Sequence, residues 1–216
     1  MLNQPIEWEN ISVNSFVIEN SIMYRNFIKE LYEQSKGLGG NFILSDNLSI
    51  KDISKYVEII PDILMIESST NKKIITGIVK ELTDIAINEK HVELQNLYSK
   101  INETISSLIF ESNGDFVFDD INDISQILKL YNIRPDDETL SLPEKILLYM
   151  GLCEKYLGKK LFVFLNLNSY FTFEEKEKLI KDFAYRKSNV LLVERYDYKS
   201  SNLETKRIID ADLCEI

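Results

Sequence analysis

Residues 161–167, Leu-Phe-Val-Phe-Leu-Asn-Leu, form an almost continuously apolar run in a chain of 216 residues. Such a run is typical of a strand that is covered on both faces of a parallel sheet. Thr172 and Glu175 follow with the spacing of a capping box, which predicts a helix over about 173–187. A second apolar run begins at Val190. Strand, helix and strand of these lengths predict a right-handed βαβ unit.

The first 70 residues mix short apolar runs with one helical stripe. Apolar residues recur at helical spacing from Ile22 and end near Gly37, which predicts a helix. Short apolar runs bounded by polar residues predict strands. We expect a buried strand over 41–45 and further strands over 15–18, 56–60 and 63–66.

Residues 71–158 have the periodicity of helices instead. Three-four spacing of apolar residues predicts two long amphipathic helices within 71–110, and two more over 121–131 and 142–157. A turn is expected at Ser112-Asn113-Gly114. The sequence therefore predicts an α/β fold with an inserted helical domain. In this prediction, residues 1–70 and 159–216 form a mostly parallel α/β head domain, and 71–158 form the α-helical domain.

Composition excludes several classes of protein. Two cysteines, Cys153 and Cys214, and one histidine, His91, exclude a disulfide framework and a cysteine-based or histidine-rich metal site. The net charge of −10 excludes a uniformly basic nucleic-acid coat. Residues 1–5 lack the basic and apolar regions of a signal peptide, and no apolar stretch is long enough to span a membrane. We therefore expect a cytoplasmic protein.

No phosphate-binding loop is evident. Residues 36–40, Lys-Gly-Leu-Gly-Gly, precede a predicted strand and lack the Gly-Lys-Ser/Thr ending that holds phosphates and Mg²⁺. We interpret them as a helix end and a turn. Asn166 and Asn168 stand where an ATPase would carry a magnesium-binding aspartate, and amides supply no negative charge. The sequence disfavours nucleotide hydrolysis.

The most unusual feature is the charge of residues 103–140. This segment has nine carboxylates and two basic residues, which accounts for −7 of the net −10. Clustered carboxylates suit Ca²⁺, which takes six to eight oxygen ligands in flexible geometry. The alternative is helix capping and solvation, because carboxylates are favourable at helix N-termini. The candidate metal ligands are Glu111, Asp115, Asp119, Asp120 and Asp123.

Basic residues lie elsewhere in the chain. Arg25 and Lys29 share a face of the first predicted helix, and Lys72, Lys73 and Lys80 lie in the first long helix. Such residues can follow the phosphates of DNA. The alternative is a set of solvated lysines on exposed helix faces.

Seven stretches of the sequence carry a family resemblance: residues 5–7, 16–20, 29–32, 120–130, 159–172, 174–175 and 188–194. Through hydrophobic pattern and short matches rather than a catalytic signature, they resemble a CRISPR-associated family, the small DNA-binding adaptation protein of type II-A systems. The resemblance covers essentially the full length of the chain in order.

This resemblance implies a function as well as a fold. It implies an ATPase-like head without a working nucleotide site, and a homotetrameric ring that encloses double-stranded DNA and loads at free ends. It implies a non-enzymatic partner of the integrase and effector nuclease during spacer acquisition. It also implies bound Ca²⁺ that stabilises the tetramer. Of the basic residues, Lys29 is carried over from the family, and the others follow from charge and helix face.

Two other functions fit the same residues. A metal-dependent nuclease would use the 111–123 carboxylates to hold Mg²⁺. A degenerate ATPase-like scaffold would bind only other proteins. DNA cleavage in the presence of divalent metal distinguishes the first alternative, and absence of DNA binding distinguishes the second.

Overall fold

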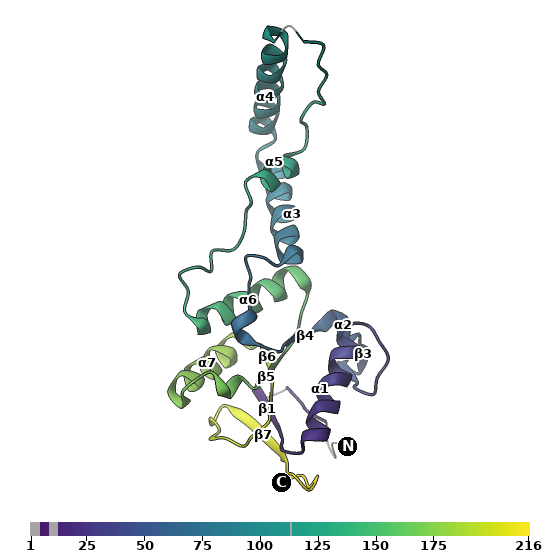
Figure 1. Cartoon of the computed structure of the whole chain (residues 1–216), viewed down its shortest axis with the longest axis vertical. Helices are drawn as coiled ribbons and strands as arrows, with labels where there is room; N and C mark the ends of the chain where they lie inside the picture. The colour runs from purple at the N-terminus through teal and green to yellow at the C-terminus, as the bar shows by residue number, and fades with distance from the viewer. Residues whose placement is uncertain (1–4, 9–12, 113) are drawn as a thin grey trace. The chain divides into compact units, whose positions relative to one another are not determined.

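A computed structural model describes residues 5–8, 13–112 and 114–216 (Figure 1). Residues 1–4 and Asn113, on which the N-terminal and 112–114 turn predictions depend, lie outside this range. The elements are β1 (Val13–Ile18), α1 (Ser21–Ser35), β2 (Leu44–Asp46), β3 (Ser49–Lys51), α2 (Ile53–Tyr56), β4 (Val57–Ile60), η1 (Ile63–Met65), α3 (Lys72–Glu89), α4 (His91–Glu111), α5 (Ile124–Leu130), α6 (Leu142–Leu157), β5 (Leu161–Leu165), η2 (Leu167–Ser169), α7 (Phe173–Arg186), β6 (Asn189–Glu194) and β7 (Glu204–Ile209).

Five strands form one parallel sheet in the order β4-β5-β6-β1-β7. The predicted βαβ unit is confirmed, since β5 and β6 are parallel neighbours joined by α7. Thr172 and Glu175 form both hydrogen bonds of the capping box that begins α7. The chain is thus an α/β protein with a helical part, as predicted.

Successive residues of β5 pack on opposite faces of the sheet, and a helix covers each face. Phe164 stacks on Phe183 of α7, with ring centroids 5.7 Å apart. Val163, one residue earlier, packs in the cluster that α1 covers, and Phe27 of α1 lies 5.3 Å from Phe16 of β1. Within the α/β unit, α1 and α7 lie on opposite sides of the strands (Figure 1). The sequence of β5 is therefore continuously apolar, because neither face of this strand meets water.

The connection from β6 to β7 has no helix, and a buried polar network holds it instead. Glu204 at the start of β7 accepts hydrogen bonds from the Ser15 hydroxyl at 2.7 Å and the Tyr198 hydroxyl at 2.9 Å. Lys176 of α7 pairs with the same carboxylate at 3.4 Å and donates to the Lys199 carbonyl at 2.7 Å. This network ties β1, α7 and β7 together.

Contacts between residues divide the chain into two compact units. One consists of Met1–Ser68 with Asp137–Ile216, and the other is Ser69–Asp136. The predicted helical domain included α6, but the structure places α6 with the sheet. The Tyr149 hydroxyl donates to Glu58 of β4 at 2.7 Å, and Arg186 of α7 donates to the Leu147 carbonyl at 2.9 Å. These bonds decide which core the helix joins.

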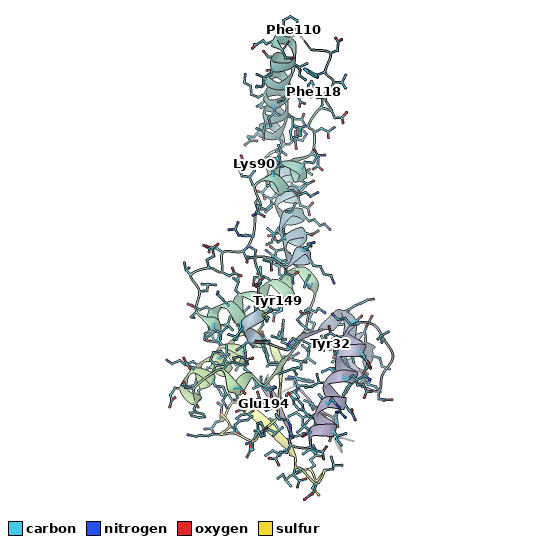
Figure 2. All side chains as sticks on the ribbon, viewed as in Figure 1. Tyr32, Lys90, Phe110, Phe118, Tyr149 and Glu194 are labelled. Atoms are coloured by element: carbon cyan, nitrogen blue, oxygen red, sulfur yellow. The ribbon has the colours of Figure 1, made fainter. Side chains whose placement is uncertain are left out.

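The helical unit consists of α3, α4 and α5. Leu94 and Tyr98 of α4 and Ile124 of α5 form its buried cluster. Lys90 alone separates α3 from α4 (Figure 2). Both long helices were predicted within 71–110, and that prediction is confirmed. His91 lies at their junction as the first residue of α4 and is exposed.

Two local predictions were wrong, and one strand was not predicted. The expected buried strand at 41–45 is part of an exposed hairpin, in which Asn47 and Leu48 have positive φ angles and Ile43 is exposed. The expected strand at 63–66 is the short helix η1, because the Asp62 side chain accepts from the Leu64 N–H. Strand β7 was missed, since four of its six residues, Glu-Thr-Lys-Arg, are polar or charged and it lies at the edge of the sheet.

None of the described helices combines the length and the apolar composition that crossing a bilayer demands.

Candidate nucleic-acid interface and acidic segment

The outer face of α1 carries a stripe of basic and aromatic residues. Arg25, Lys29, Tyr32 and Lys36 recur at the spacing that places residues on one helix face, and all are exposed. The Lys36 ammonium lies 5.0 Å from the centre of the Tyr32 ring. Lys29 pairs with Glu33 at 3.7 Å, in an exposed contact that water and salt screen. We call Arg25, Lys29, Tyr32 and Lys36 the α1 basic stripe.

The inner face of α1 holds this stripe in place. Asn20 caps the helix through its side-chain oxygen, which accepts from the Ile22 and Met23 N–H groups. The helix ends in the hydrogen bonds of a Schellman motif, from Gly37 to Gln34 and from Leu38 to Glu33. Gly37 has a φ of 83°, so the interpretation of residues 36–40 as a helix end and turn is confirmed.

Sequence reasoning identified Arg25 and Lys29 but missed Tyr32 and Lys36. Extending the same spacing to the seventh and eleventh residues after Arg25 would have found both. The stripe therefore has three cations and one ring that can stack on a base or sugar.

The three candidate lysines of α3 belong to the helical unit. Lys72, Lys73 and Lys80 are exposed, and Lys73 and Lys80 lie seven residues apart on one face. Lys72 and Lys73 occupy the first turn after the cap residue Asn71, and that turn has no acidic residue. Cations at a helix N-terminus gain nothing from the helix dipole. The Asn71 side chain accepts from the Lys73 and Ile74 N–H groups, so the lysine side chains, and not the helix N-terminus, would contact an external anion.

The place of a phosphate loop, between β1 and α1, is filled by the protein itself. Only Glu19 and Asn20 join the two elements, which is too short for a glycine-rich loop. Arg195, just after β6, donates to the carbonyls of Ile18 and Glu19 and to the Ser21 hydroxyl. Together with the Asn20 cap, these bonds occupy groups that would hold a phosphate.

The five candidate metal ligands lie in the helical unit but do not converge. Glu111 is at the end of α4, where it accepts from Ser107. Asp115, Asp119 and Asp120 are exposed in the segment between α4 and α5 and make no hydrogen bond or ion pair with described residues. Among the residues that the structure describes, no three carboxylate, histidine or cysteine side chains form a metal-binding group.

Asp123, the fifth candidate ligand, has a structural role as the cap of α5. Its carboxylate caps α5 by accepting from the Ser125 hydroxyl at 2.6 Å and the Ser125 N–H at 2.8 Å. These bonds hold the pKa of Asp123 below its usual value. The capping alternative therefore applies to this residue.

Aromatic and aliphatic side chains accompany the acidic segment. Phe110 of α4 and Phe116, Val117 and Phe118 are exposed, and Figure 2 shows Phe110 and Phe118 on the helical unit. Asn102 of α4 fixes the end of the segment, because its side chain accepts from the Ile121 N–H at 3.0 Å and donates to the Ile121 carbonyl at 3.3 Å. The carboxylate oxygens of the acidic segment suit Ca²⁺, but the described residues of one chain do not complete a site.

The buried cysteine, Cys153, lacks the environment of a nucleophile. Burial raises the pKa of Cys153 to about 12, and its thiol lies in the core that α6 helps to form. Cys214 is exposed near the C-terminus.

Comparison with known families gives a match over most of the chain. The family model described as CRISPR-associated protein (Cas_Csn2) matches residues 32–213. The matched region contains the whole helical unit and most of the α/β unit. The chain therefore belongs to the CRISPR-associated protein (Cas_Csn2) family.

Proposed function

We propose that this protein binds double-stranded DNA without regard to sequence, as a homotetrameric ring that loads at free DNA ends. It acts in spacer acquisition of a type II-A CRISPR system, with the integrase and effector nuclease as partners, and it has no enzymatic activity of its own. The α1 basic stripe is the observation that carries this proposal. Three exposed cations in line along α1 and its C-terminal cap residue are suited to phosphate contacts.

An acidic protein can bind DNA if its charges are separated. Most of the net negative charge is in residues 103–140, whereas the α1 basic stripe and the α3 lysines lie outside that segment. Phosphate contacts fix position and carry no sequence information directly. A ring with lysines on its inner surface would therefore slide along any duplex, and the acidic segment would lie away from DNA or be neutralised by cations.

We expect Lys29→Glu to weaken binding to a linear duplex several-fold. The substitution replaces an attraction to a phosphate with a repulsion. In a plot of the logarithm of the binding constant against the logarithm of the salt concentration, the magnitude of the slope should therefore fall by about one for each phosphate that is no longer neutralised. A gel-shift or fluorescence titration over a range of salt concentrations measures both effects, and native mass spectrometry checks that the tetramer remains.

Lys181→Glu is a matched control. Lys181 lies on α7, is exposed like Lys29, and pairs with the carboxylate four residues before it, Glu177, at 3.9 Å. Its reversal should leave affinity unchanged, because α7 is on the opposite side of the sheet from α1. Equal affinities of the two variants would remove Lys29 from the DNA surface.

We also propose that Ca²⁺ binds between copies of the chain and stabilises the tetramer. Asp115, Asp119 and Asp120 have carboxylates free of other described partners, and one chain does not gather enough of them. Carboxylates of two copies would supply the six to eight oxygens that Ca²⁺ takes. The ion would also offset the repulsion between two acidic segments.

Chelation of Ca²⁺ is therefore expected to lower the native mass and weaken DNA binding together. Asp119→Asn combined with Asp120→Asn should reproduce this result without a chelator, because neutral amides hold Ca²⁺ less strongly. Asp182→Asn, an exposed residue of α7, is the control. A chelated protein that keeps its mass and its affinity would contradict the role of calcium.

A further inference from the structure

Glu194 is a buried carboxylate at the carboxyl end of the central strand β6. Only 3% of the residue is exposed, and Figure 2 labels its position in the α/β unit. One oxygen accepts a hydrogen bond from the Asn168 N–H at 3.2 Å. Carboxyl ends of parallel strands are where open α/β sheets place their functional groups. Here, that edge holds an acid that neither DNA binding nor the metal proposal uses.

Unsatisfied polar groups surround this carboxylate. The Tyr24 hydroxyl of α1 and the side-chain nitrogen of Asn168 are buried, and neither has a hydrogen-bond partner among the described residues. Asn166, which begins the η2 turn, has a φ of 53° and donates its N–H to the Val193 carbonyl at 2.9 Å. The η2 turn and α1 thus approach β6 through polar groups that are not fully bonded.

The charged and titratable groups that face Glu194 come from several elements. Lys176 of α7 attracts its carboxylate, and Tyr24 of α1 and Tyr198 of the 195–203 connection each interact electrostatically with it. Arg195 lies 5.9 Å from the Tyr24 ring, but it is engaged by the Ile18 and Glu19 carbonyls. Within the described part of the chain, neither Lys176 nor Arg195 makes a hydrogen bond or an ion pair with the Glu194 oxygens.

We propose that Glu194 is a proton-controlled latch between β6, the η2 turn and α1. With its proton, the carboxyl group has both a donor and an acceptor, so it can form hydrogen bonds with Asn168 and with the Tyr24 hydroxyl at the same time. Without its proton, it is a buried charge with a 3.2 Å hydrogen bond from the Asn168 N–H and no ion pair among the described residues, so the turn opens to bring water to it. The latch is therefore closed at low pH and looser at high pH.

The electrostatics of the site agree with this direction. Burial raises the pKa of Glu194 to about 7, and the backbone hydrogen bond from Asn168 and the attraction of Lys176 offset only part of that rise. A carboxyl group whose pKa is higher in the closed state than in the open state favours closure below its ordinary pKa. That preference is lost as the pH rises through about 7.

Hydrogen exchange of the whole protein tests the latch. We expect backbone amides of residues 166–170 to exchange about tenfold faster at pH 8 than at pH 6, after correction for the intrinsic rate. Glu194→Gln should exchange equally at both pH values, because glutamine keeps an acceptor and a donor and cannot ionise. Glu174→Gln, at an exposed position of α7, should behave as the unmodified protein.

Direct titration separates this role from a purely structural one. The carboxyl carbon of Glu194, followed by NMR in the unmodified protein, should titrate with a midpoint near 7. A midpoint near the ordinary glutamate value would overturn the proposal. So would a pH dependence of exchange that persists unchanged in Glu194→Gln.

Discussion

Replacing Lys176 with methionine is expected to lower the free energy of unfolding of the α/β unit by about 3–5 kcal/mol. The side chain of Lys176 is 3% exposed and that of Glu204 is fully buried, with 3.4 Å between the ammonium and the carboxylate. Methionine fills a similar volume but leaves the carboxylate without its cation. A buried charge without a partner is among the most destabilising changes a single substitution makes.

The surroundings of Lys176 enlarge this effect. Its ammonium also lies 4.0 Å from the centre of the Tyr198 ring and donates to the Lys199 carbonyl. The 195–203 connection has no helix to cover β1, so these bonds hold it against the sheet. Removal of the cation therefore weakens the attachment of β7 as well as the ion pair.

Urea denaturation followed by tryptophan fluorescence measures the change. The chain has one tryptophan, Trp8, whose indole N–H donates to the Val190 carbonyl of β6 at 3.1 Å, so its emission reports on the α/β unit. Lys181→Met is the control, because this lysine is exposed and its ion pair contributes little. Equal unfolding midpoints for the two variants would contradict the account of the network.

A double substitution separates the ion pair from the packing. Glu204→Gln removes the charge and keeps an oxygen for the Ser15 and Tyr198 hydroxyls. Combined with Lys176→Met, it is expected to recover much of the stability, since no unpaired charge then remains. A double variant less stable than Lys176→Met alone would show that packing, not the buried charge, dominates.

The parts of the fold that follow from local sequence were predictable. The apolar run of β5 and the capping box at Thr172 determine the βαβ unit with contacts close in sequence. Leu142–Leu157 was also predicted as a helix, but its assignment to the sheet depends on the Tyr149–Glu58 bond across 91 residues. An amphipathic pattern shows that a helix buries one face and not which core covers it.

Edge elements escaped prediction for a different reason. Strand β7 reads Glu-Thr-Lys-Arg-Ile-Ile, and its pairing with β1 offsets a weak local preference. The β2–β3 hairpin turns at Asn47-Leu48 rather than at a glycine, so the usual turn signal is absent. Both elements exist because of pairing and backbone geometry that single-residue preferences do not encode.

The candidate site was predictable only in part. Arg25 and Lys29 followed from their spacing, whereas Lys36 lies just beyond the helix end and Tyr32 carries no charge. The acidic segment was visible as a charge imbalance, but its described carboxylates do not meet within one chain. The burial of Glu194 depends on α1, α7 and η2 packing around one strand end, and no local pattern shows it.

The most direct test of a DNA-end-binding ring compares a linear duplex with a covalently closed, relaxed circle of the same sequence. A protein that only contacts phosphates along one side binds both forms equally, because their backbones are alike. A closed ring must pass over an end. We therefore expect a gel shift with the linear duplex and none with the circle at the same protein concentration.

Blocking both ends completes this measurement. A linear duplex whose ends carry bulky protein caps should resist loading, and caps added after loading should retain the protein when salt is raised. Mg²⁺ is included, so that shortened DNA would reveal the nuclease alternative. We expect intact DNA, binding to the open linear duplex and none to the circle, whereas equal binding to linear and circular DNA would contradict a ring that loads at free ends.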